Sequence, residues 1–283
     1  MNDGDETYIM LLLTDSNLPT GSFVASSGLE SSIAHGFSSL TPSPLVTFIQ
    51  DSLPTYARST LPFVSDAHRV VARYKEEVEG SEGNVKAGGL EEASRQLAEL
   101  DELYDTMTLN HVAKRASKAQ GVALLTLFSK GFSQPPSLAA YTDAESRDKE
   151  SKMRELLDGY KFKVRREDVQ GHLPICWGAL AAALGLKLER TQYLHLFLHA
   201  RSLLSAGVRL NNIGPYGAQQ LLLHAVRPLL EAEVTKCKDL QTGFLVVPGG
   251  NFNEPTQGPA NTWPLGEILS SRHDLQHSRI FNS

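Results

Sequence analysis

Two pairs of histidines have a spacing that could place metal ligands side by side. His195 and His199 are four positions apart, as are His273 and His277, and on a helix each pair would project from one face. Neutral imidazole is a common metal ligand, but a selective site needs a complete ligand set. No local carboxylate supplies a third ligand to His195 and His199. We interpret that pair as hydrogen-bonded core or interface histidines and keep a metal site as the alternative.

The sequence offers little for catalysis. Asp15 and Glu30 could act as an acid–base pair, but no nucleophile or oxyanion-stabilising group accompanies them. The chain has no Walker-type phosphate loop, GxSxG elbow, HExxH pair or dinucleotide fingerprint. The run Pro248-Gly249-Gly250-Asn251 lacks the lysine and the helix signature of a phosphate loop, so we read it as a turn. The sequence therefore predicts that the protein is not an enzyme and has no catalytic residue.

The charge of the chain argues against a nucleic-acid partner, and its cysteines indicate the redox state of its compartment. The formal net charge is −5, and the one basic cluster, at residues 161–166, is followed at once by Glu167 and Asp168. Because nucleic-acid binding needs a basic face, we interpret this cluster as a solvated helix end. Two cysteines, Cys176 and Cys237, suit a reducing compartment.

Neither a signal peptide nor a membrane span is expected. The first seven residues are acidic, where a signal peptide would be basic. The longest uncharged apolar stretch, from Leu173 to Leu186, is shorter than the roughly 20 residues that a span needs. We expect a cytoplasmic protein with no membrane partner and no nucleic-acid partner.

Helical periodicity dominates the elements that would position these residues. Apolar residues recur every three or four positions from Leu109 to Phe128, with Lys114, Arg115 and Lys118 on the opposite side. Pro44 and Pro62 suit helix starts. Further helices are expected at 90–106, at 188–210 as a buried central helix, and at 215–237 with a kink or break at Pro228.

Strand patterns are nearly absent, and the best candidate, Phe244 to Val247, is isolated. We therefore predict an all-α fold: one domain, residues 1–283, built as a bundle of about ten helices. Long surface loops are expected at about 79–89, 131–151 and 248–264, where Gly, Pro or charged residues gather.

Three segments are unusual for plain connections. Pro19-Thr20-Gly21-Ser22-Phe23 places a large apolar residue in a turn, and the stretch from Arg209 through Gly214 and Pro215 to Gln219 joins two helices. The end of the chain, Ser278 to Ser283, carries Arg279, Ile280 and Phe281 where termini are usually polar and frayed. Helix capping accounts for the second segment equally well, whereas the tail is expected to be docked.

These segments together resemble the UreF family of urease accessory proteins. The resemblance lies in Thr14 to Phe23 with Ser26 to Glu30, in Gly171-His172-Leu173-Pro174 leading into Leu184-Gly185-Leu186, in Ser205 to Gln219, and in the ending Ser278 to Ser283. It spans nearly the whole chain. The loops at 131–151 and 248–264 are longer than those of bacterial members, which favours a eukaryotic, fungal or plant member.

The resemblance implies an all-α, dimeric protein without catalytic activity of its own. Such a protein would bind UreD (also called UreH) and recruit the GTPase UreG for nickel insertion into apo-urease, with an effect on GTP hydrolysis. It needs no cofactor, since nickel is handled by the assembled complex. The implied partner-binding residues are Pro19, Thr20, Gly21, Ser22, Phe23, Arg209, Gly214, Pro215, Gln219, Arg279, Phe281 and Ser283.

The alternative is a metallochaperone that itself holds nickel. Its ligands would be His195 and His199, or His273 and His277, because nickel accepts imidazole.

Overall fold

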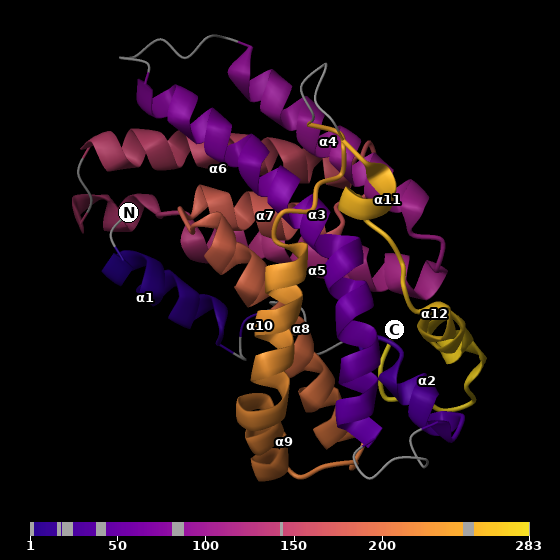
Figure 1. Cartoon of the computed structure of the whole chain (residues 1–283). Coiled ribbons are helices and arrows are strands. Elements are labelled where there is room, and N and C mark those ends of the chain that lie inside the picture. Colours follow the sequence, from indigo (N-terminus) through magenta and orange to yellow (C-terminus); the bar gives the residue numbers. More distant parts are fainter. Residues whose placement is uncertain are drawn as a thin grey trace. The chain divides into compact units, whose positions relative to one another are not determined.

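The structure is a computed structural model that describes residues 3–15, 18, 25–37, 44–80, 88–141, 144–245 and 252–282. These residues contain no β-strand, so the all-α prediction is confirmed. The α-helices are α1 (Asp3–Leu13), α2 (Leu29–Ala34), α3 (Pro44–Gly80), α4 (Gly89–Met107), α5 (His111–Leu127), α6 (Ala144–Arg165), α7 (Leu173–Ala183) and α8 (Leu188–Arg209) (Figure 1). They continue with α9 (Pro215–Leu221), α10 (Arg227–Cys237), α11 (Glu254–Gln257) and α12 (Pro264–Ser271).

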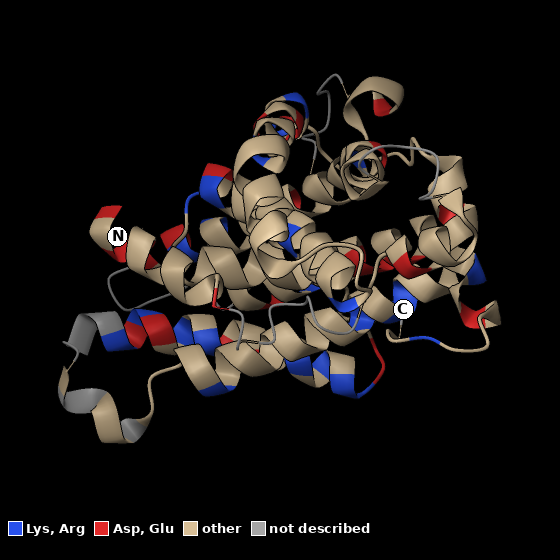
Figure 2. Ribbon diagram, turned by 90° about the horizontal axis from the view of Figure 1, so that it is seen from below, with Lys and Arg blue, Asp and Glu red and all other residues tan. Residues whose placement is uncertain are grey.

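Shorter turns complete the described chain. Two are π-helical, η2 (Phe128–Phe132) and η4 (Leu222–Val226), and two are 3₁₀, η3 (Pro136–Tyr141) and η5 (Arg272–Leu275). The first turn of α1 is acidic, as Figure 2 shows beside the N-terminus. Among the described helices, none combines the length and the hydropathy required to span a bilayer.

The chain divides into two compact units. Unit 1 comprises residues 1–19, 63–107 and 118–191, and unit 2 comprises residues 20–62, 108–117 and 192–283. Helices α3, α5 and α8 contribute residues to both, and the division within α3 falls between Pro62 and Phe63. That the whole chain forms one domain stays a prediction.

In unit 1, α4, α6 and α7 pack against one another. The core includes Trp177 and Tyr160, and Gly178 of α7 lies so close to α3 that an added Cβ would be 2.3 Å from the Val64 carbonyl oxygen. Asp101 of α4 is fully buried and accepts backbone N–H groups from Gln170, Gly171 and His172 at 2.6, 2.9 and 2.7 Å. This carboxylate fixes the connection between α6 and α7.

Unit 2 has its own apolar core. The early turns of α3 present Ile49, Leu53 and Ala57 at spacings of four, which forms one stripe of the helix. That stripe packs with residues of α8 and α10, and with Phe281 of the C-terminal tail. Phe281, the third residue from the end of the printed sequence, is therefore part of the core of this unit.

Several local expectations are wrong. Pro62 lies inside α3, together with Pro54, rather than at a helix start, so each removes one backbone hydrogen bond from that helix. Leu109 precedes α5 and is 89% exposed, because Asn110 caps the helix after it. The predicted loop at 131–151 is short: η3 occupies Pro136–Tyr141 and α6 begins at Ala144.

The loop predicted at about 79–89 falls between α3, which ends at Gly80, and α4, which begins at Gly89, and its residues 81–87 lie outside the described residues. The stretch 248–264 contains α11, and its residues 248–251 also lie outside the described residues. Phe244 and Leu245 form a turn, while Val246 and Val247 are outside the described residues. The expected break near Pro228 is present, because the π-helical turn η4 ends at Val226 and Pro228 lies in the first turn of α10.

Candidate functional site

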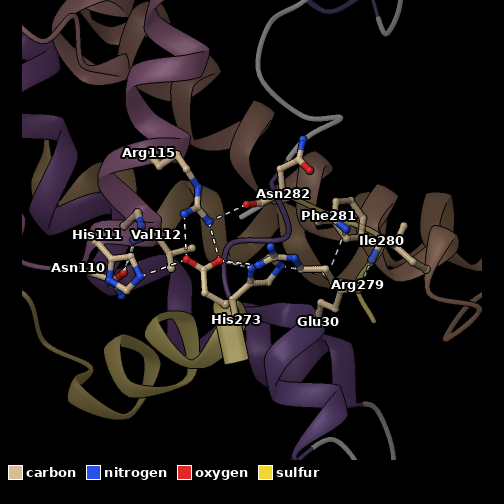
Figure 3. A network of polar contacts seen from close by, with 12 residues as sticks. Glu30, Asn110, His111, Val112, Arg115, His273, Arg279, Ile280, Phe281 and Asn282 are labelled. Carbon is tan, nitrogen blue, oxygen red and sulfur yellow. Dashed lines mark hydrogen bonds and ion pairs between the residues drawn. The ribbon is translucent and has the colours of Figure 1, made fainter. Parts of the chain in front are cut away.

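The C-terminal tail of unit 2 lies in a network of polar contacts supplied by three elements. Figure 3 shows Glu30 of α2, Arg115 of α5 and His273 of η5 grouped around Arg279, Ile280, Phe281 and Asn282. We call Glu30, Arg115 and Asp274, with the tail residues that they bind, the tail clasp. Every member belongs to unit 2.

Glu30 holds the tail backbone. Helix α2 begins after Gly28, whose φ of 87° is in the left-handed region that glycine readily adopts. This start places Glu30 in the first turn, where its carboxylate accepts the Ile280 N–H at 2.6 Å and the Phe281 N–H at 3.2 Å. The residue is only 6% exposed, and its second oxygen faces Nε2 of the fully buried His273 at 3.3 Å. Hydrogen bonds to a buried carboxylate are among the stronger ones in proteins.

Asp274 is the acidic centre of the charged part of the clasp. Arg115 binds it through two guanidinium nitrogens at 2.9 and 2.8 Å, and Arg279 binds it at 2.6 Å. His111 Nε2 is 3.2 Å from the same carboxylate. The pKa of Asp274 is far below its usual range, chiefly because Arg115 donates to the ionised form, with a further contribution from Arg279.

Arg115 also reaches the end of the tail, because its Nη2 donates to the Asn282 carbonyl oxygen at 2.8 Å. Its helix is fixed by Asn110, whose side-chain oxygen accepts the N–H groups of Val112 and Ala113 at 3.0 and 3.2 Å. The amide nitrogen of Asn110 donates to the Glu267 carbonyl of α12. The cap therefore links α5 to α12 and orients Arg115.

Of the residues predicted from sequence, the structure brings Arg209 and Phe281 together, and Arg279 of the same tail binds Asp274. Phe281 is 2% exposed, and the Arg209 guanidinium lies over its ring at 4.4 Å from the centroid. Arg279 remains on the surface, and the next residue, Ile280, is 54% exposed. In the described residues Phe281 is packed into unit 2, while the role of Ser278 to Ser283 as a docking tail stays a prediction.

The other predicted partner-binding residues are not part of the clasp. Gly214, Pro215 and Gln219 lie exposed at the start of α9, next to Tyr216, which is 88% exposed. Within the part of the chain that the structure describes, no hydrogen bond or ion pair joins these three residues to the tail. Pro19, Thr20, Gly21, Ser22 and Phe23 lie outside the described residues, as does Ser283.

The two histidine pairs differ in their surroundings. His195 and His199 both stack on Tyr56, with ring centroids 5.3 and 3.5 Å away, and burial lowers the pKa of each to about 3. Both imidazoles are therefore neutral at physiological pH. His273 is buried against Glu30, whereas His277 is exposed. The described residues include no group of three or more His, Cys, Asp or Glu side chains that could hold a metal ion.

Sequence reasoning missed three residues of the clasp. Glu30 was considered only for acid–base chemistry and Arg115 only as part of a solvated helix face, and Asp274 was not singled out. Glu30 does lie in one of the segments that carries the family resemblance, which was the available signal. Nothing local in the sequence pairs Arg115 with Asp274, because 159 positions separate them.

Comparisons with known proteins point in one direction. A family model described as UreF matches residues 41–226. Urease accessory protein 6 of Cryptococcus neoformans var. grubii is 41% identical, over 98% of this chain and 97% of its own length. A Schizosaccharomyces pombe protein named urease accessory protein UreF-like is 29% identical, over 98% of this chain and 97% of its own length. Urease accessory protein F of Arabidopsis thaliana is 29% identical, over 96% of this chain and 90% of its own length.

Proposed function

The chain belongs to the UreF family, and from this premise we propose that it is a non-catalytic adaptor in the maturation of urease. It dimerises, binds UreD (UreH), and recruits the GTPase UreG, so that nickel is inserted into apo-urease and GTP hydrolysis is regulated. The assembled complex handles the nickel, and the chain itself needs no cofactor. Its place of action is the cytoplasm.

The observation that carries this proposal is the tail clasp. Glu30 and Asp274 hold the last residues of the chain in one conformation, yet Arg279 is on the surface and Ile280 is 54% exposed. Arginine and large apolar side chains are frequent anchors of protein interfaces. A tail that is ordered before binding also avoids part of the entropy cost of association. The clasp thus supports a partner surface that is prepared in advance.

The remaining residues implied by the family complete the proposal. Gly214, Pro215 and Gln219 are exposed beside Tyr216, which suits a second contact face. We assign them, together with Pro19 to Phe23 and Ser283, to the dimer or partner faces. Arg209 and Phe281 act from beneath the surface, because they fix the tail to the core of unit 2.

The test is co-purification of the full chain with UreD and UreG homologues, followed by size-exclusion chromatography with light scattering. We expect a complex with a dimeric core. Arg279→Ala should weaken its assembly about tenfold or more, which corresponds to about 1.4 kcal/mol of binding free energy. Arg227→Ala is the matched control, because Arg227 is also an exposed arginine paired with one carboxylate, that of Glu231 at 2.9 Å.

Two outcomes would contradict the proposal. Normal assembly of Arg279→Ala would remove the tail from the mechanism, and failure to recover either partner would remove the adaptor role. A nickel titration of the isolated chain addresses the metallochaperone alternative. We expect weak binding or none, whereas stoichiometric binding that disappears in a His195→Gln, His199→Gln variant would replace the adaptor with a nickel carrier.

A further inference from the structure

A cluster of three cations in unit 1 lies outside the tail clasp and has no part in the proposed function. Lys161 and Arg165 are on α6, four positions apart and therefore on one face. Lys130 is in the π-helical turn η2, against which α6 packs. Lys161 is 8% exposed, and its ammonium donates to the Ser129 hydroxyl oxygen at 3.0 Å.

Among the residues that the structure describes, no carboxylate pairs directly with this cluster. Asp158 offsets part of its charge, because it contacts at 2.6 Å the Ser129 hydroxyl to which Lys161 also donates, but it is paired with Arg154 at 3.3 Å. Among the described residues, none of the three cations has a carboxylate oxygen within 4.0 Å. Burial lowers the pKa of Lys161, and the charges of Arg165 and Lys130 lower it further, against an opposing effect of Asp158.

Helix-end electrostatics accounts for only part of this arrangement. Lys163 and Arg165 lie in the last turn of α6, where cations are favoured by the helix dipole. Lys161 lies further from that end, and a buried lysine is normally paired with an acidic group. Ser129 and Lys130 occupy a π-helical turn, a rare element that is frequent at functional sites.

We propose that Lys130, Lys161 and Arg165 form a binding site for a phosphate group. A phosphate monoanion or dianion supplies the negative charge that the cluster lacks and has enough oxygens to accept from all three side chains. The Lys161 ammonium uses one of its three N–H donors on Ser129, which leaves two for the ligand. Arg165 offers a planar fork suited to two phosphate oxygens. The basic stretch interpreted from sequence as a solvated helix end thus includes a ligand site.

The test compares thermal unfolding of the full chain in inorganic phosphate and in chloride at matched ionic strength. A ligand that binds only the folded state raises Tm, and at concentrations above its Kd the rise grows with the logarithm of the ligand concentration. We expect a phosphate-dependent rise in Tm for the wild type and for the control Lys163→Gln, whose lysine is on the same helix outside the cluster. Lys161→Gln should lose the rise.

The comparison with variants is needed because phosphate also stabilises proteins through exclusion from their surface. An equal rise in the wild type and Lys161→Gln would therefore overturn the proposal. If Lys161→Gln does not fold, Lys130→Gln and Arg165→Gln take its place, and calorimetry should give at least a fivefold weaker affinity for phosphate in each. Unchanged affinity in both would also overturn it. Titration with phosphoserine identifies the source: tighter binding than inorganic phosphate indicates a phosphate ester, and weaker binding indicates the free anion.

Discussion

In each of the two units a buried carboxylate accepts successive backbone N–H groups, but the consequences differ. In unit 1 the fully buried carboxylate of Asp101 accepts three successive backbone N–H groups. In unit 2 the nearly buried carboxylate of Glu30 accepts two, from Ile280 and Phe281. Each has a buried histidine nearby: His172 follows in the segment held by Asp101, and His273 faces Glu30.

The difference lies in what the carboxylate holds. Asp101 fixes an internal connection, in which Gly171 has a φ of 75° and His172 is buried and hydrogen-bonded to Asp105 at 3.0 Å. Glu30 fixes the last residues of the chain, and the side chains of Arg279 and Ile280 remain exposed. Opening the first segment would disturb the core of unit 1, whereas the second carries exposed side chains on either side of a single buried residue, Phe281. The same interaction therefore stabilises a fold in one place and presents a surface in another.

The largest effect is expected for Asp101→Asn. The amide cannot accept three N–H groups as a carboxylate does, and its own NH₂ would face those donors. Each buried N–H group that is left without an acceptor costs about 1–3 kcal/mol, so we expect a loss of about 3 kcal/mol. Urea denaturation should show this loss in the free energy of unfolding. Glu102→Gln, at the neighbouring exposed position of α4, is the control and should change stability by less than about 0.5 kcal/mol. Equal stability of both variants would contradict the comparison.

Mild acid should weaken the fold before it weakens the charged part of the tail clasp. Burial lowers the pKa of His195 and His199 to about 3, while in the unfolded chain each has a pKa near 6.5. Because the unfolded chain binds protons first, stability is highest above pH 6.5 and falls below it. Between pH 6.5 and 5 the loss is about 2 kcal/mol per imidazole. The same direction holds for His172, whose pKa burial lowers.

Asp274 behaves differently, because its lowered pKa keeps it ionised throughout this range. Its contribution is lost only below the unfolded value of about 3.9, as pH falls through the folded pKa. Urea denaturation at pH 7, 6 and 5 should therefore show falling stability, while cleavage of the tail by carboxypeptidase under native conditions stays constant. A His195→Gln, His199→Gln variant should have a shallower dependence of stability on pH. An unchanged dependence would contradict the assignment of the acid effect to these imidazoles.

The helical spacing of apolar residues predicted much of the fold because it shows which side of a helix is buried. It located α5 and α8 and the break before Pro228, since apolar spacing and proline act locally. The preference of proline for helix starts failed at Pro62, where the packing of the long helix α3 overrides the cost of an internal proline. The apolar spacing failed for Leu109, which continues the apolar pattern of α5 but lies before its cap.

The sequence predicted only those parts of the candidate site in which a residue type is unusual for its position in the chain. Phe281 near the end of the chain pointed to a docked tail because a large apolar side chain is costly to expose. Glu30 and Asp274 gave no such sign, since their roles depend on contacts with residues far away in sequence. Glu30 is 250 positions from Ile280, and no local pattern encodes that pairing.

Glu30→Gln tests the other half of the comparison and should have the smaller effect on stability. Glutamine can still accept one of the two tail N–H groups, so we expect a loss of about 1–2 kcal/mol. The tail itself should be affected more, with faster removal of the last residues by carboxypeptidase than in the wild type. Glu254→Gln, an exposed position in unit 2, is the control. Equal protection of the tail in Glu30→Gln and the wild type would mean that Arg115 and the burial of Phe281 hold it without Glu30. Asp101 and Glu30 would then differ, because only Asp101 would be needed to hold its backbone segment in place.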